Sequence, residues 1–110
     1  MGKVIGRFYF KLSDNGNLLG EYSNAGSTEC DVEAAKRIHT SEETSVEPFE
    51  GEYTSTWTEG KKVESATLKI TRRPNSAGIF SVIWCDGNRE LFTGEAMVVD
   101  RILIGNYESK

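Results

Sequence analysis

The chain has 110 residues, a formal net charge of −4 and a pI near 5.0. A chain of this length builds one hydrophobic core, and its 37% of hydrophobic residues suffice to fill it. The acidic balance argues against nucleic acid as a partner, because phosphate binding requires clustered Lys and Arg. We therefore expect one folded domain over residues 1–110 that binds no nucleic acid.

The first ten residues, MGKVIGRFYF, contain no apolar run long enough for a signal peptide, and no stretch has the length of a membrane span. These features favour a cytoplasmic protein without a membrane partner. The two cysteines, Cys30 and Cys85, lack the spacing of metal ligands. In a reducing compartment we expect both to be buried and unpaired, with a disulfide as the less favoured alternative. No metal or cofactor is predicted.

Residues 4–24 show the alternation of a β-hairpin. In VIGRFYFKL, every second residue from Val4 to Leu12 is apolar or glycine, and more polar residues mostly occupy the other face. Asn15 and Gly16 follow, a pair that readily takes the positive φ of a tight hairpin turn. The segment NLLGEYSN then provides the returning strand.

The next segment, residues 28–40, changes character. Cys30, Ala34 and Ile38 lie at helical spacing. The start of the segment is acidic and its end is basic, with Glu29, Asp31 and Glu33 followed by Lys36, Arg37 and His39. This order of charges complements a helix dipole, and His39 at the end fits such a charge better than a catalytic role. The pattern predicts one short helix over 28–40.

Residues 48–108 have the pattern of a β-meander. Polar turns separate five runs with period-two alternation: FEGEYTSTW, VESATLKITRR, IFSVIWC, ELFTGEAMVV and ILIGNYES. Asp86-Gly87 marks the strongest of these turns. Together with the hairpin, this makes seven strands and one helix, which indicates an antiparallel sandwich or barrel.

Three segments share a Gly-x-Tyr pattern: LLGEYSN, FEGEYTS and LIGNYES. Gly and Tyr are two residues apart, so in a strand both point to the same face. A glycine on the concave face allows a sheet to coil sharply, and Gly94 adds a fourth position of this type. The recurrence therefore favours a strongly curved sheet, most simply a barrel.

The run from residue 49 to residue 107 resembles the meander of small calycin barrels, the lipocalin and avidin group, and of uncharacterised bacterial lipocalin-like proteins. Gly51-Glu52-Tyr53 stands where that group typically has Gly-x-Trp, and NGNLLGEYS is similar to the second strand of avidin-type barrels. The resemblance covers about half of the chain. It implies a barrel with an interior ligand, but the residues that bind biotin have no match here and no strand carries a haem-ligand His.

A closed antiparallel meander requires an even number of strands, so the count of seven needs an explanation. The long strand 48–58 could bend and serve twice, or the helix could cover a gap between the second and third strands. Alternatively, a free edge could pair with a second copy and form a homodimer. We favour the helix, and so predict an all-β calycin-like barrel of about seven or eight strands with one short helix between strands two and three.

Alternation directs most of the large aromatic side chains to the interior. The candidate ligand-binding residues are Tyr22, Tyr53, Ser55, Trp57, Trp84 and Tyr107. Two interpretations stay open, because small barrels are either filled by side chains or hollow enough for one small ligand. We expect a small, largely apolar molecule in the interior, with Ser55 able to orient it.

Two alternatives remain at this stage. One is an interaction or oligomerising module with a filled core and no enzymatic activity. The other is a cavity-type enzyme without a recognisable motif. No catalytic residue is predicted, because the acidic residues that follow strand glycines, Glu21, Glu52 and Glu95, alternate with inward positions and should face solvent.

Overall fold

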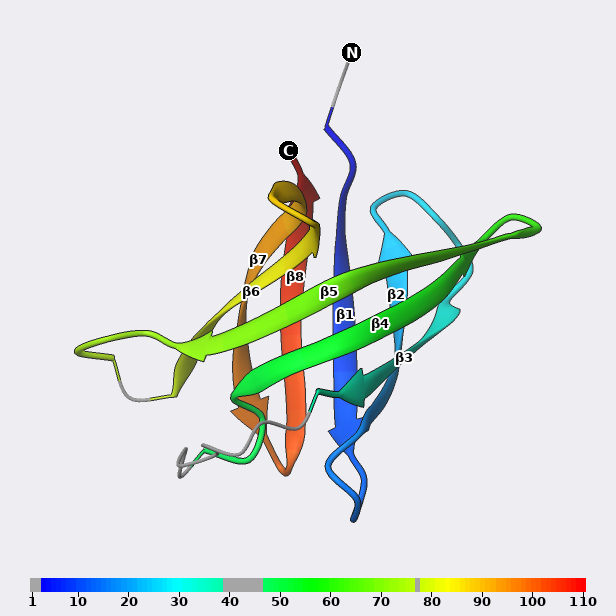
Figure 1. The fold of residues 1–110 in the computed structure, drawn as a ribbon. Coiled ribbons are helices and arrows are strands. Elements are labelled where there is room, and N and C mark those ends of the chain that lie inside the picture. The colour runs from blue at the N-terminus through cyan, green and yellow to red at the C-terminus, as the bar shows by residue number, and fades with distance from the viewer. Residues whose placement is uncertain (1–2, 39–46, 77) are drawn as a thin grey trace.

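The computed structural model describes residues 3–38, 47–76 and 78–110, which form an eight-stranded antiparallel barrel (Figure 1). In chain order the strands are β1 (Ile5–Leu12), β2 (Leu18–Asn24), β3 (Asp31–Arg37), β4 (Gly51–Glu59), β5 (Lys62–Arg72), β6 (Ile79–Asp86), β7 (Arg89–Val99) and β8 (Ile102–Ser109). Each strand pairs with the next, and β8 pairs with β1. The predicted all-β fold and its closed meander are therefore confirmed.

The helix predicted over 28–40 is wrong, because residues 31–37 form β3 instead. Strand β3 lies between β2 and β4 and turns Glu33 and Ala35 into the barrel. The inward face of DVEAAKR thus carries a charged residue beside a small one, which conceals the alternation of a strand. His39 lies outside the described residues. The described part of the chain contains no helix long and apolar enough to cross a membrane.

Strand β3 is the eighth strand that the count required. Because β8 pairs with β1 and β3 fills the place between β2 and β4, each of the eight strands has a partner on both sides. The helix is not needed to cover a gap, and no strand needs to serve twice. The free edge that suggested a homodimer is also absent from the described strands, so a dimer would need another surface.

Inward glycines lie where neighbouring strands approach most closely. A Cβ atom on Gly20 would lie 1.7 Å from the carbonyl oxygen of Tyr9, and one on Gly94 would lie 1.9 Å from that of Asn106. Both distances are far below van der Waals contact, so only glycine fits these two positions. This close approach agrees with the sharp coiling that the glycine pattern predicted.

The interior is packed solid through the middle of the barrel. The side chains of its core with at most 1% of their surface exposed include Phe10, Tyr53, Leu68, Ile70, Phe80, Val82 and Leu103. They come from five strands, β1, β4, β5, β6 and β8, and interdigitate across the barrel axis. Side chains therefore fill the barrel at the level of these residues.

Arg37 closes one end of the barrel. Its guanidinium lies 4.7 Å above the ring of Tyr53 and donates to the Tyr53 hydroxyl at 2.6 Å. It also donates to the carbonyl oxygens of Gly16 and Glu50, each at 3.0 Å. The side chain thus ties the β1–β2 turn to the segment that precedes β4. We call this the closed end.

The two cysteines differ in their surroundings. Both are unpaired, as predicted, and Cys85 is buried. Cys30, however, is exposed, so the prediction that it is buried is wrong. The predicted helix would have placed Cys30 on an apolar face with Ala34, whereas in the structure Cys30 precedes β3 on the surface.

Candidate functional site: an aromatic cup at the open end of the barrel

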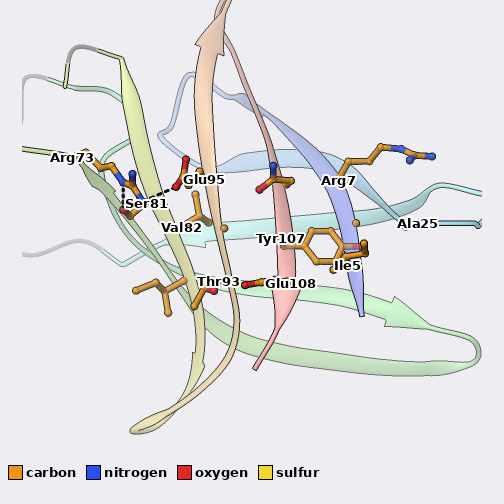
Figure 2. Close-up of a pocket in the computed structure, with 14 residues that line it drawn as sticks. Ile5, Arg7, Ala25, Arg73, Ser81, Val82, Thr93, Glu95, Tyr107 and Glu108 are labelled. Carbon is orange, nitrogen blue, oxygen red and sulfur yellow. Dashed lines mark hydrogen bonds and ion pairs between the residues drawn. The ribbon is translucent and has the colours of Figure 1, made fainter. Parts of the chain in front are cut away.

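One hollow, of about 720 Å³, lies on the outer surface of β6, β7, β8 and β1 (Figure 2). On one side of it, Arg73 forms an ion pair with Glu95 at 2.7 Å and donates a hydrogen bond to Ser81 at 3.2 Å. These side chains are partly or largely exposed and are satisfied by one another. We interpret this outer groove as a polar surface rather than as a ligand site.

The second hollow is a cup of about 370 Å³ at the end of the barrel opposite Arg37. It opens beside the two chain ends, since Val4 and Ser109 both contribute to its lining (Figure 1). Strand β4 reaches it with Trp57 and Glu59, several residues beyond Tyr53 at the closed end. The solid core therefore forms the floor of the cup.

Five aromatic side chains from five strands form the wall of the cup: Tyr22, Trp57, Trp84, Phe92 and Tyr107. Their rings meet edge to face. The centroids of Phe92 and Tyr107 are 5.8 Å apart at 84°, those of Trp84 and Tyr107 are 6.1 Å apart at 71°, and those of Trp57 and Phe92 are 6.5 Å apart at 79°. Tilted pairs at these separations are the favoured arrangement of aromatic rings, so the wall is a packed unit.

Hydrogen bonds hold the two tyrosines of this wall in place. The hydroxyl of Tyr22 donates to the carbonyl oxygen of Thr58, and that of Tyr107 donates to Oδ1 of Asn24, each at 2.6 Å. The first bond joins β2 to β4, and the second joins β8 to β2. Both rings are thus anchored at their tips.

Glu33 lies deep in the cup. It points inward from β3, in register with Gly20 on one side and Trp57 on the other, and only 4% of its surface is exposed. The Ser55 hydroxyl donates to its Oε2 at 2.5 Å, and the indole Nε1–H of Trp84 donates to the same oxygen at 2.7 Å. A carboxyl group is rarely buried to this extent without a specific partner or function.

The second oxygen of Glu33 is differently placed. Oε1 accepts no hydrogen bond from any residue between 3 and 38, 47 and 76 or 78 and 110. In the same part of the chain, no side-chain oxygen or nitrogen is both fully buried and without a hydrogen-bond partner. Oε1 therefore retains access to the cup, while Oε2 is held by the protein.

The cup shifts the pKa of its ionisable groups. Burial raises the pKa of Glu33 above its usual value, and the hydrogen bonds from Ser55 and Trp84 oppose this effect only in part. Burial also raises the pKa of Tyr22 to about 12, with the charge of Asp31 adding to the effect. The pKa of Tyr107 is likewise raised to about 12, first by burial and then by Tyr22. Burial thus disfavours negative charge on Glu33 and on the two tyrosines of the wall.

The structure separates the six side chains that the sequence brought together as a candidate site. Trp57, Trp84, Tyr107 and the half-buried Tyr22 line the cup. Ser55 lies below it and contacts Glu33. Tyr53 belongs to the closed end instead, because it packs under Arg37. That these residues bind a ligand stays a prediction.

Sequence reasoning missed two residues of the cup. Phe92 was not included in the candidate site, and Glu33 was assigned to the start of a helix. The sequence feature that could have revealed Glu33 was the odd number of predicted strands. An eighth strand over 31–37 would have placed Glu33 and Ala35 on one face, with Ala35 fixing that face as the interior.

The described residues contain no group of three or more His, Cys, Asp or Glu side chains that could hold a metal ion. No protein-family model, no curated protein and no solved structure matches this chain. The closed eight-stranded antiparallel meander is consistent with a calycin-like barrel. Any assignment of function must therefore start from the cup itself.

Proposed function

We propose that this protein is a lipocalin-like or avidin-like binding barrel that takes a small molecule with an apolar body into the cup. The observation that carries this proposal is the contrast between the two parts of the interior. The barrel is packed solid up to the level of Ser55, and above it five aromatic rings surround an open hollow. A sequence selected only for stability would fill that space, because unfilled apolar volume costs stability.

The dimensions and the lining of the cup support the same proposal. Ligand pockets usually measure roughly 300–1,000 Å³, so 370 Å³ suits a small molecule. Such pockets combine an apolar wall with a few fixed polar groups that orient the ligand. Here the aromatic rings supply the wall, and Oε1 of Glu33 supplies a polar group at its base.

Native mass spectrometry of gently purified protein tests the proposal. We expect an adduct of small-molecule mass on the wild-type chain. Phe92→Ala should lose the adduct, because it removes a ring from the wall. Ile83→Ala should retain it, because Ile83 lies in the outer groove and not in the cup. An adduct that is lost from Ile83→Ala and kept by Phe92→Ala would place the ligand in the groove and contradict the proposal.

A second candidate function, an oligomerising module, is favoured by an apolar patch on the outer face. Met97, Val99 and Ile104 are 49%, 47% and 43% exposed, and the β7–β8 register places Met97 directly opposite Ile104. Exposed apolar side chains that adjoin one another often mark a protein contact. The mass in solution tests this candidate. If it is correct, the wild type forms dimers that Ile104→Lys dissociates, and a monomeric wild type would refute it.

A further inference from the structure

The charged residues that line the cup are all of one sign. Twelve residues line it, among them Asp31, Glu33 and Glu59, and none of the twelve is Lys, Arg or His. Walls of low dielectric concentrate the field of such carboxylates within a cleft. The cup therefore attracts a cation and repels an anion whenever these groups are ionised.

The hydrogen-bonding groups of the aromatic wall also favour a cation over an anion. Tyr22 and Tyr107 donate their hydroxyl protons to Thr58 and Asn24. The indole N–H groups are also engaged, since Trp57 donates to Glu59 at 3.1 Å and Trp84 donates to Glu33. All four aromatic donors are thus bonded within the protein. None of these donors is left for a ligand, whereas the π-electrons of the rings and the hydroxyl lone pairs can attract a cation.

We propose that the cup binds an organic cation, a small ammonium compound with an aromatic or aliphatic body, and that Oε1 of Glu33 is the counter-ion that receives its charge. This inference rests on the proposed function and defines the chemical class of its ligand. It also revises the expectation of a largely apolar molecule, because the deepest group of the cup is a carboxyl.

The aromatic rings and the carboxylate of Glu33 act together on an ammonium ligand. The negative face of an aromatic ring attracts a cation within about 6 Å of its centroid, and the effect is strongest for Trp and for desolvated sites. The carboxylate of Glu33 supplies a full charge at the same place. Because a buried carboxylate is costly without a partner, the cation also satisfies Oε1, which has no hydrogen bond from the described residues.

Binding is coupled to the protonation of Glu33. When its carboxyl is protonated in the free cup, a bound ammonium displaces that proton, which passes to the buffer, and the ammonium keeps its own protons. The affinity for the cation should therefore rise as the pH rises through the raised pKa of Glu33.

Other ionisable groups face the same space or lie near it, and the positive charge of Arg7 on β1 opposes the rise in the pKa of Tyr107. Asp31 on β3, Tyr22 on β2, Glu59 on β4 and Tyr107 on β8 line the cup. On β5, Glu64 is in register with Trp57 and is paired with Lys62 at 3.4 Å. From β6 and β7 the cup receives the uncharged Trp84 and Phe92. A variant at Glu33 is thus needed to assign the pH dependence to that residue.

Three soluble probes of nearly equal size test the inference on the wild-type protein: 2-phenylethylammonium, 2-phenylethanol and phenylacetate. Both tryptophans of the chain line the cup, so intrinsic fluorescence reports directly on its occupancy. Isothermal titration in two buffers counts the protons released. We expect the ammonium to bind about tenfold or more tightly than the alcohol and phenylacetate to bind more weakly than either.

Glu33→Gln keeps the shape of the side chain and removes its charge. We expect it to abolish the preference for ammonium over alcohol, together with the proton release and the pH dependence. Glu95→Gln is the matched control, because it removes an exposed carboxylate from the outer groove and should preserve the preference.

The outcomes distinguish this inference from the proposed function. Equal binding of ammonium and alcohol to the wild type would overturn the cation inference and leave a ligand-binding cup. A preference for ammonium that survives Glu33→Gln would overturn the role of Glu33. If no probe changes the tryptophan emission or releases heat, both the inference and the function on which it rests are contradicted. The comparison on wild-type protein remains decisive even if the variant fails to fold.

Discussion

Replacement of Glu33 by glutamine should change how the stability of the barrel depends on pH. The buried carboxyl has a folded-state pKa above the value of 4.5 that it has when exposed. Between these two pKa values the folded state holds a proton that the unfolded state has lost. The stabilising contribution of the protonated group is therefore complete at low pH, and it is lost as the pH rises through the folded-state pKa.

The size of this effect follows from linkage. One proton bound by the folded state but not by the unfolded state changes the free energy of unfolding by at most about 1.4 kcal/mol per pH unit. The substituted glutamine would keep an oxygen that can accept from Ser55 and Trp84, but it does not titrate. Relative to wild type, Glu33→Gln should gain stability with rising pH up to a plateau above the folded-state pKa, and the slope should vanish at low pH.

Urea denaturation of both proteins between about pH 4 and pH 8 measures this difference. Glu95→Gln serves as the control, because its ion pair with Arg73 is largely exposed and such pairs contribute only about 0–1 kcal/mol. A difference between Glu33→Gln and wild type that stays constant over this range would refute the reasoning. It would mean that Glu33 has the same pKa in the folded and unfolded chains.

Three further predictions concern the cup wall, the closed end and the coiled strands. Spectrophotometric titration should show two tyrosines ionising near pH 12, and Tyr22→Phe should remove one of them and leave Tyr107. Arg37→Met should lower the free energy of unfolding by about 3 kcal/mol, because the bonds at the closed end are lost. Gly20→Ala should cost about 3 kcal/mol, since its Cβ would clash with the carbonyl oxygen of Tyr9.

Each of these predictions has a matched control. Lys36→Met removes an exposed cation from the same strand as Arg37 and should change the stability little. Gly26→Ala meets no atom within 4 Å and should cost only about 1 kcal/mol through its positive φ. Equal losses for Arg37 and Lys36 variants, or for the two glycine variants, would contradict the structural account, as would titration of all four tyrosines near pH 10.

Most of the fold could be predicted from period-two alternation and from turn residues. Phe8 and Phe10 alternate with polar neighbours, and both are buried in β1. Asn15-Gly16 lies in the turn where Leu12 pairs with Leu18. These signals are local, because each identifies a strand by its one apolar face or marks the turn that follows the strand.

Strand β3 could not be identified in the same way, because its inward face is not apolar. Glu33 points into the cup and Arg37 covers the closed end, so the face that should be apolar holds two charges. Helical spacing of small residues and a favourable order of charges then gave the stronger local signal. Pairing with β2 and β4 overrides that signal, because closure of the barrel satisfies the backbone of all three strands.

For a related reason, only part of the candidate site could be predicted from the sequence. Alternation states which face a side chain occupies, but not at which height along the barrel it lies. Tyr53 and Trp57 share the inward face of β4, yet one belongs to the closed end and the other to the cup. The height depends on the stagger between neighbouring strands, which no single strand reveals.

Nuclear magnetic resonance of the indole N–H signals during titration with 2-phenylethylammonium tests whether the cup is the binding site. The chain has two tryptophans, and both line the cup. If the ligand binds in the cup, the signals of Trp57 and Trp84 should both shift and saturate together, while the amide of Ile83 in the outer groove should not move. Shifts of Ile83 and its neighbours, with both indole signals unchanged, would show that the cup is not the binding site.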